Sequence, residues 1–238
     1  MKIRILIGSM LIAGLISVST ALASSPTNCG IFRDVSATHI NCAAIQYAYQ
    51  QGIFSGYNVD KYNDSTADFK PDQAIIRAEV LKVALAAFVN KNFTNTGVQG
   101  DAFPYSDLKG WGNQWWFAYL QEAMNRKMIE GYKDGTFKPQ NNVTRAEFLK
   151  IFLSASPSLT QVTTEVIHNY DNLWADTAPT AWYAQYMIFA NINGLFADFN
   201  YCEHGSICPN KDISRANVAQ MIYNYHVYLK VPVGFAKK

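Results

Sequence analysis

Residues 131–139 read Gly-Tyr-Lys-Asp-Gly-Thr-Phe-Lys-Pro, and residues 143–147 read Val-Thr-Arg-Ala-Glu. The Asp-Gly pair of the first segment is typical of a tight turn, and the aromatic residues on either side indicate a short hairpin. In the second segment, Thr144 and Glu147 have the spacing of a capping box, so a helix is predicted to begin at Arg145. A cation at the first helical position is unfavourable for the helix dipole, so this arginine needs another explanation.

The same pattern occurs three times along the chain. An Arg-Ala pair begins at Arg77, Arg145 and Arg215, at intervals of 68 and 70 residues. Upstream of each arginine stands an aromatic-x-Asp segment, which ends at Asp34, Asp107 and Asp176, respectively. Internal similarity at a fixed period is the strongest organising signal that a sequence can carry. The sequence therefore predicts a protein of three repeats.

The repeat unit resembles a surface-layer homology (SLH) domain. The resemblance rests on the aromatic-x-Asp opening, an apolar helix that ends in a glycine turn, Gly-Tyr-x-Asp-Gly-x-Phe-x-Pro, and Thr-Arg-Ala-Glu. The repeats are placed at residues 31–90, 104–156 and 173–230, and the second matches at nearly every position. In the third, Ala197 replaces the glycine and Asn217 the glutamate, and in the first, His39 stands near the expected tryptophan.

The expected fold class is mainly α, with each repeat formed by a helix, a turn or short hairpin, and a second helix. Helices are predicted over residues 39–51, from 114, and over 77–89, 145–154, 182–193 and 215–229. One unit of about 55 residues cannot bury both of its helix faces alone. We therefore expect the three units to share one core in a pseudo-threefold bundle, as the resemblance also implies.

Residues 1–23 have the features of a secretory signal peptide: a basic start, an apolar stretch, and Ala-Leu-Ala before the cleavage position. An uncleaved membrane anchor is the alternative. Residues 24–30 form a short lead, and no later stretch reaches the roughly 18 apolar residues of a membrane span. We thus expect a secreted protein that has no contact with the membrane after cleavage.

Charge disfavours one class of partner. Removing Lys2 and Arg4 with the signal peptide leaves 18 basic and 18 acidic residues. Proteins that bind nucleic acid usually carry a basic excess, so nucleic acid is not expected as a partner. No cofactor is expected either.

Four cysteines in an exported chain suggest two disulfides. The local pairings Cys29–Cys42 and Cys202–Cys208 are the most economical. Neither spacing is that of a zinc knuckle, and His204 is the one nearby imidazole, so no metal site is predicted.

The recurring arginines are candidates for anion binding. A guanidinium together with free backbone N–H groups at a helix start suits a carboxylate or a phosphate. In the alternative interpretation, each arginine pairs with a nearby acid, such as Asp34, Asp107 or Asp176, and only fastens the repeats together.

The resemblance implies a ligand. SLH triplets anchor proteins non-covalently to secondary cell-wall polysaccharides, which often carry ketal-linked pyruvate. The resemblance therefore also implies that the chain is a protein of the bacterial cell surface. The positions that the resemblance assigns to the ligand are Arg145, Asp107, Trp115, Trp116, Gly131, Tyr132 and Lys133 in the second repeat, Arg77, Asp34, Gly56 and Tyr57 in the first, and Arg215, Asp176 and Trp182 in the third. In the second repeat, Arg145 takes the carboxylate, and Trp115 or Trp116 packs on the sugar; since these tryptophans are adjacent, one is expected in the core and the other at the surface.

Two other functions are compatible with parts of the sequence. The chain is alternatively a structural protein of the surface layer, whose repeats pack against identical copies or another surface protein without sugar specificity. As an enzyme, it offers scattered carboxylates but no recurring Asp/Glu pair apart from the capping and clasp positions, and no Ser-His-Asp or Cys-His set. No enzymatic activity is therefore expected.

Overall fold

The computed structural model describes residues 27–58, 67–89, 93, 97–156, 174–196, 202 and 205–229. The predicted signal peptide 1–23, Ala197 and His204 lie outside the described residues. The elements are β1 (Asn28–Cys29), β2 (Phe32–Ser36), α1 (Cys42–Gln50), α2 (Arg77–Val89), the 3₁₀ helices η2 (Gly100–Ala102) and η3 (Ser106–Leu108), α3 (Phe117–Asn125), α4 (Arg145–Ala155), α6 (Ala184–Ile192) and α7 (Arg215–Tyr228).

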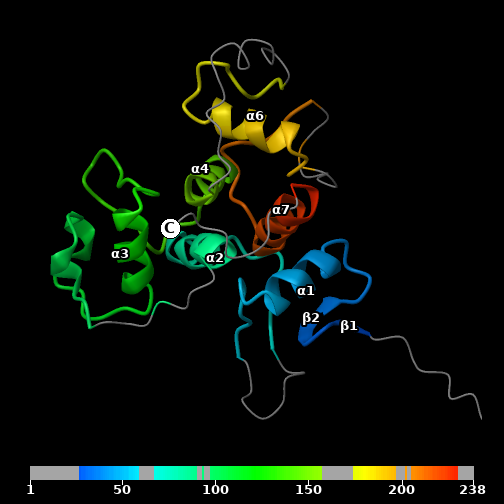
Figure 1. Cartoon of the computed structure of the whole chain (residues 1–238), viewed down its shortest axis with the longest axis horizontal. Coiled ribbons are helices and arrows are strands. Elements are labelled where there is room, and N and C mark those ends of the chain that lie inside the picture. The colour runs from blue at the N-terminus through cyan, green and yellow to red at the C-terminus, as the bar shows by residue number, and fades with distance from the viewer. Residues whose placement is uncertain are drawn as a thin grey trace, which may run out of the picture.

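The described residues are mainly helical, as predicted, and fall into three units. Unit 1 contains β1, β2, α1 and α2, unit 2 contains α3 and α4, and unit 3 contains α6 and α7. The second helices α2, α4 and α7 lie together at the centre, and α1, α3 and α6 lie outside them (Figure 1). Each unit thus extends outward from a shared centre.

The second helix of each unit begins where the sequence predicts. Thr144 and Glu147 form a capping box: the Thr144 hydroxyl accepts a hydrogen bond from the Glu147 amide at 3.3 Å, and the Glu147 carboxylate accepts one from the Thr144 amide at 3.0 Å. Ser214 caps α7 in the same way, by accepting from the Asn217 amide. These local contacts fix the helix starts.

The first helices begin two or three residues later than predicted. In each unit the residues just before the helix form a single turn, closed by a hydrogen bond from the first helical amide to the carbonyl three residues earlier. These bonds join Cys42 to His39, Phe117 to Gln114, and Ala184 to Ala181. The apolar periodicity of the sequence continues through this turn and therefore predicts a helix there as well.

The Asp-Gly turn forms as predicted, but it does not extend into paired strands. The Gly135 amide donates to the Tyr132 carbonyl at 2.9 Å, the Tyr132 amide donates to the Thr136 carbonyl at 2.8 Å, and Gly135 has a φ of +78°. A left-handed glycine after a type I-like turn is usual for a hairpin loop of this length. In the described residues, the one strand pair is β1–β2, at the start of unit 1.

An aspartate fastens the turn of each unit to its opening segment. Asp34 accepts hydrogen bonds from the Phe69 and Lys70 amides at 2.8 and 2.7 Å. Asp107 accepts from the Phe137 and Lys138 amides, both at 2.8 Å, and Asp176 from the Ile207 and Cys208 amides at 3.0 and 2.6 Å. The predicted site aspartates therefore hold backbone amides within their own units.

Replacement of Asp107 by alanine is expected to lower the free energy of unfolding by about 2 kcal/mol, because two amides would lose a charged acceptor. Asp107→Asn keeps one acceptor oxygen and should lose about half as much. Urea denaturation followed by circular dichroism measures both values. Equal stability of Asp107→Ala and the parent would show that water replaces the carboxylate without loss.

Backbone hydrogen bonds link the three units in a closed ring. The Ile75 amide donates to the Ile213 carbonyl, the Ile213 amide to the Val143 carbonyl, and the Val143 amide to the Ile75 carbonyl, each at 3.0 Å. Every unit thus donates to one neighbour and accepts from the other, which places the three segments before α2, α4 and α7 against one another.

The N–H groups at the starts of α2, α4 and α7 are not free, contrary to the expectation from sequence. The Arg145 and Ala146 amides donate to the Lys211 and Pro209 carbonyls of unit 3, both at 2.9 Å. The corresponding amides of α2 donate to unit 2, and those of α7 to unit 1. Because carbonyls of the next unit occupy these donors, the helix starts are not open anion sites.

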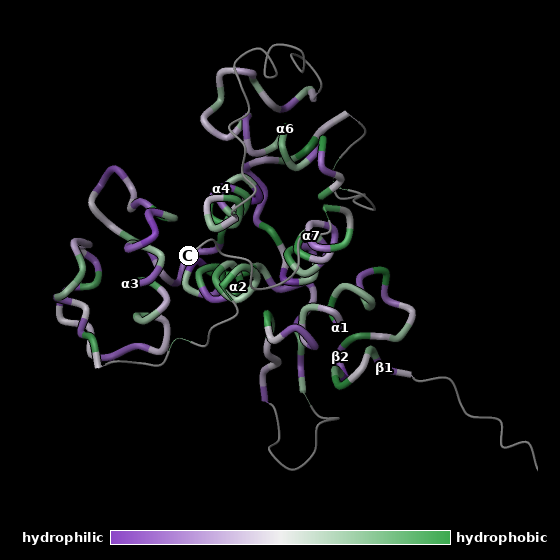
Figure 2. The backbone as a smooth tube through the Cα atoms, in the orientation of Figure 1, coloured by the Kyte–Doolittle hydropathy of each residue, from purple (hydrophilic) through white to green (hydrophobic). Residues whose placement is uncertain are grey.

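Aromatic side chains from all three units meet in the core. Phe88 of α2, Phe152 of α4 and Tyr225 of α7 contact one another with ring centroids 4.8 to 5.3 Å apart. Hydrophobic residues occur on the central helices and also on the outer helix α6 (Figure 2). Trp116 is fully buried while Trp115 is 48% exposed, which confirms that one of the two adjacent tryptophans belongs to the core.

Both predicted disulfides are present. Cys29 pairs with Cys42, which joins β1 to the start of α1, and Cys202 pairs with Cys208 beside the turn of unit 3. The paired cysteines are 13 and 6 residues apart in the sequence, respectively.

A buried histidine makes the stability depend on pH. Burial lowers the pKa of His226 from 6.5 to about 4, and its Nδ1 lies 3.1 Å from the Tyr47 hydroxyl. Between pH 6.5 and 4 the unfolded chain binds a proton that the folded chain does not, so stability falls as the pH is lowered through this window. The loss is expected to approach about 3 kcal/mol near pH 4.

Urea denaturation at pH 7, 5.5 and 4 measures this effect. In His226→Phe, the part of the pH dependence that comes from this group should disappear, whatever the stability of the variant at pH 7. An identical pH dependence of parent and variant would exclude His226 as its source.

Candidate ligand-binding grooves

Three cavities lie where the units meet, and each is lined by one buried arginine. The Arg77 groove has a volume of about 610 Å³, the Arg145 groove about 430 Å³, and the Arg215 groove about 310 Å³. We name each groove after its arginine.

The Arg77 groove draws residues from all three units. Tyr132, from the turn of unit 2, and Glu147 and Lys150 of α4 form one wall. Trp182 of unit 3 lies just before α6, and Arg77 is the first residue of α2 in unit 1. The arginine that meets the Gly-Tyr turn therefore belongs to another unit.

The Arg215 groove repeats this arrangement, displaced by one unit. Tyr57 comes from unit 1, with Glu79 and Lys82 on α2, Trp115 comes from the residues before α3 in unit 2, and Arg215 begins α7 in unit 3. The five positions correspond one by one to those of the Arg77 groove.

The arginine of the Arg77 groove fastens units 1 and 2. Its side chain is 6% exposed, and its Nη2 donates to the Glu130 carbonyl at 2.8 Å. The guanidinium lies over the rings of Tyr132 and Phe137, at 4.8 and 5.0 Å from their centroids. Its Nε is buried and has no hydrogen-bond partner among the described residues.

Arg215 is held in the same manner by unit 1. Its Nε donates to the Phe69 carbonyl at 2.8 Å, its Nη1 lies 3.6 Å from the Glu79 carboxylate, and its guanidinium covers the Tyr57 ring at 4.6 Å. Burial lowers the pKa of Arg215. Arg145 in turn donates to the Ile207 carbonyl of unit 3.

The arginines thus do fasten the units, as the alternative interpretation holds, but through other partners than the expected ones. Arg77 and Arg215 bond to backbone carbonyls of the next unit, whereas Asp34, Asp107 and Asp176 bond to amides of their own units. Backbone acceptors explain why a cation is kept at the first position of each helix, and aromatic faces add to this for Arg77 and Arg215.

A tyrosine orients the glutamate of each of these two grooves. The Tyr132 hydroxyl donates to the Glu147 carboxylate at 2.9 Å, and the Tyr57 hydroxyl donates to Glu79. Burial and these hydrogen bonds raise the pKa of both Tyr132 and Tyr57 to about 12. Both phenols are therefore protonated donors at neutral pH.

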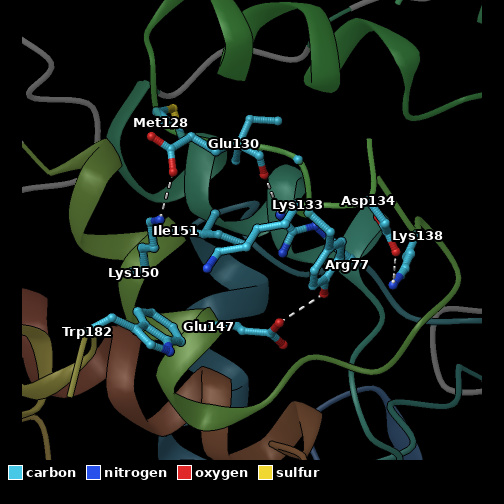
Figure 3. Close-up of a pocket in the computed structure, with 13 residues that line it drawn as sticks. Arg77, Met128, Glu130, Lys133, Asp134, Lys138, Glu147, Lys150, Ile151 and Trp182 are labelled. Atoms are coloured by element: carbon cyan, nitrogen blue, oxygen red, sulfur yellow. Dashed lines mark hydrogen bonds and ion pairs between the residues drawn. The ribbon is translucent and has the colours of Figure 1, made fainter. Parts of the chain in front are cut away.

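The accessible part of the Arg77 groove contains an indole, lysine ammonium groups and two carboxylates, Glu130 and Asp134, whose side chains are 80% and 52% exposed and each pair with a lysine. Trp182 is 52% exposed, and the Lys150 ammonium lies 5.7 Å from its ring centroid and 3.1 Å from the Glu130 carboxylate. Lys150 and Trp182 lie at one side of the pocket, the Asp134–Lys138 ion pair lies at the other, and Lys133 lies between them (Figure 3). Such a surface suits a sugar that carries a negative charge.

The structure groups the predicted site residues differently from the sequence. Gly131, Tyr132 and Lys133 line one groove, as expected, but they do so with Arg77 and Trp182 rather than with Arg145 and Trp115. The other two grooves divide the remaining candidates. Gly56 and Tyr57 share the Arg215 groove with Trp115, Arg145 has its own groove, Trp116 is in the core, and Asp34, Asp107 and Asp176 fasten the turns.

Several residues of these grooves were missed from the sequence, and two of them, Lys82 and Lys150, follow a simple rule. Lys82 and Lys150 stand five positions after Arg77 and Arg145, at the same place on the helix face, and this fixed offset would have revealed them. In unit 1, moreover, it is Ile40 rather than His39 that corresponds to Trp115 and Trp182, since each stands two residues before a first helix.

Two classes of feature are absent from the part of the chain that the structure describes. Among these residues no group of three His, Cys, Asp or Glu side chains is placed to hold a metal ion. No helix within them has the length and the apolar character needed to cross a membrane.

Comparison with known proteins points to one family. A model of the S-layer homology domain matches residues 31–81 and 104–149. The chain is 35% identical over 124 residues to cell surface glycoprotein 1 of Acetivibrio thermocellus, which covers 49% of this chain and 5% of that protein. It is 31% identical over 116 residues to the cellulosome-anchoring protein of the same organism, covering 49% of this chain and 24% of the relative.

A third relative aligns with nearly the whole chain. The S-layer protein EA1 of Bacillus anthracis is 25% identical over 226 residues, which make up 92% of this chain and 22% of that protein. The chain thus spans less than a quarter of the length of each of these three relatives. The family match therefore assigns S-layer homology domains to residues 31–81 and 104–149.

Proposed function

We propose that the chain anchors non-covalently to the bacterial cell wall by binding an anionic secondary polysaccharide, with ketal-linked pyruvate as the charged group, in the grooves between its units. The S-layer homology domains and the surface-layer and cell-surface relatives mark the chain as a protein of the cell surface. The cellulosome-anchoring relative supports an anchoring role, rather than an enzymatic one, for the part that the two proteins share.

We further propose that unit 3 is a divergent third repeat and that the three units are related by an approximate threefold axis. Two observations support this arrangement. Asp176 accepts two backbone amides as Asp34 and Asp107 do. In the ring of backbone hydrogen bonds, Ile75, Val143 and Ile213 also make equivalent bonds, one from each unit to a neighbouring unit.

The Arg77 groove is the observation that carries the proposed function. It combines an exposed indole, Trp182, with the ammonium groups of Lys133 and Lys150 in a cavity of about 610 Å³. A pyruvate ketal is a carboxylate attached to a sugar ring, so it needs a cation and an apolar face at the same place. The groove offers both.

A pull-down of the chain on purified cell-wall sacculi tests the proposal. The sacculi are used intact and after the attached polysaccharide has been removed by acid or alkali. Binding to intact sacculi alone is the expected result. Binding to neither preparation, together with a mass in size-exclusion chromatography that rises with concentration, would contradict it and favour a self-assembling structural protein.

A further inference from the structure

The three grooves differ at corresponding positions of their walls. Where the Arg77 groove has Trp182 and the Arg215 groove Trp115, the Arg145 groove has Ile40. Where the first two have a glutamate two residues after the helix start, the third has Asn217. The tryptophan and the glutamate are thus both replaced in a single groove.

The position of the lysine is changed as well. Lys82 and Lys150 stand five residues after Arg77 and Arg145, and the residue five positions after Arg215 is Gln220. The Gln220 side chain is buried, whereas the Lys150 side chain is 35% exposed. The Arg145 groove therefore lacks an ammonium group at this position of the helix, and its lysine, Lys211, stands before the helix start instead.

The Gln220 amide is part of a buried chain of hydrogen bonds that joins units 1 and 3. Asn41 donates to the Gln220 carbonyl oxygen at 3.1 Å, Gln220 donates to Asn224 at 2.9 Å, and Asn224 donates to the Leu195 backbone carbonyl at 3.2 Å. Buried amides that bond to other protein groups stabilise one fixed arrangement of the two units. Asn41, the first member of this chain of hydrogen bonds, lines the Arg145 groove, so this side of the groove is a seam between units 1 and 3.

The Arg145 groove also has a less positive net charge than the other two grooves. The Arg215 groove is lined by two cations, Lys82 and Arg215, and one acid, Glu79, and the Arg77 groove by four cations and three acids. The Arg145 groove is lined by two cations and two acids: Arg145, Lys211, Asp72 and Asp212. A carboxylate thus meets an excess positive charge in two grooves and none in the third.

We propose that one chain binds two anionic sugar groups, in the Arg77 and Arg215 grooves, and that the Arg145 groove serves as the seam that closes the three units into a ring. This inference rests on the proposed function and specifies its sites. Lys150 with Trp182 holds one sugar, and Lys82 with Trp115 holds the other.

Native mass spectrometry of the whole chain with a monosaccharide glycoside that carries a pyruvate ketal counts the bound groups. The parent is expected to bind two. Lys150→Met with Trp182→Ala should bind one, and Lys82→Met with Trp115→Ala should also bind one. The matched control for the third groove, Ile40→Ala with Asn217→Ala, should still bind two.

The possible outcomes separate this inference from the proposed function. Three bound groups in the parent, reduced to two in the Ile40→Ala, Asn217→Ala control, would show that the Arg145 groove also binds the sugar. This result would contradict the inference but not the proposed function of wall anchoring. One bound group in the parent would show that only one of the Arg77 and Arg215 grooves binds the sugar. The variant that loses this binding would identify the groove. No bound group would overturn the inference, and the sacculi assay would then decide separately whether wall anchoring stands.

Discussion

Arg215→Ala is expected to lower the free energy of unfolding by about 4 kcal/mol, because a buried cation and all of its partners would be separated at once. The Phe69 carbonyl would lose its donor, the Glu79 carboxylate would lose its ion pair, and the faces of three aromatic rings would lose their covering guanidinium. The side chain is 3% exposed, so water does not readily take its place. Arg215 also joins the last unit to the first, so its loss should weaken the packing of unit 3 against unit 1.

Thermal denaturation followed by circular dichroism measures this effect, with an expected fall in Tm of about 10 °C for a chain of this size. Arg126→Ala is the matched control. Arg126 pairs with Glu122 on the exposed surface of α3 and its terminus, and such pairs contribute about 0.5 kcal/mol or less. Similar changes in Tm for the two variants would show that the buried arginine does not hold the units together.

The helix starts could be predicted from the sequence because the contacts that fix them are local. Thr144 and Glu147 stand three residues apart and meet in a capping box whatever surrounds them. The turn before them follows in the same way from Gly135, whose φ of +78° suits glycine. In both places the interacting groups lie within a few residues of one another in the sequence.

The grouping of the grooves could not be predicted, because it depends on which unit packs against which. The sequence places Arg145 near Tyr132, 13 residues apart, yet the guanidinium over the Tyr132 ring is that of Arg77, 55 residues away. Recurrence identifies the residue types of a site, but the same recurrence fits any cyclic permutation of the partners. The backbone hydrogen bonds between the units determine which of these arrangements forms. These bonds produce no recognisable pattern in the local sequence.

The aspartates illustrate a second limit. A carboxylate near a recurring arginine suggests an ion pair, but Asp107 binds the Phe137 and Lys138 amides. Since backbone donors are present at every residue, the sequence alone does not single them out as partners.

Replacing Lys150 by methionine and Trp182 by alanine together is expected to weaken binding to intact sacculi by about 50-fold, because the Arg77 groove would lose both its ammonium group and its indole face. The two partly exposed side chains are expected to contribute about 2.4 kcal/mol together, and each 1.4 kcal/mol is a factor of ten in affinity. Methionine keeps the apolar stem that packs along α4. Trp182 is 52% exposed, so the fold should lose about 0.5 kcal/mol or less.

A titration of sacculi at fixed protein concentration measures this change, and thermal denaturation confirms that the variant is folded. Ile192→Ala is the control, because Ile192 is 49% exposed on α6, the same helix that Trp182 precedes, and does not line the groove. Its removal should leave binding unchanged, which separates a specific groove from general hydrophobic adhesion to the wall. If the double variant binds like the parent while Lys82→Met with Trp115→Ala does not, the wall polymer is held in the Arg215 groove alone. If a variant that carries all four substitutions still binds like the parent, these two grooves are not the site of anchoring, and the exposed tryptophans have no part in it.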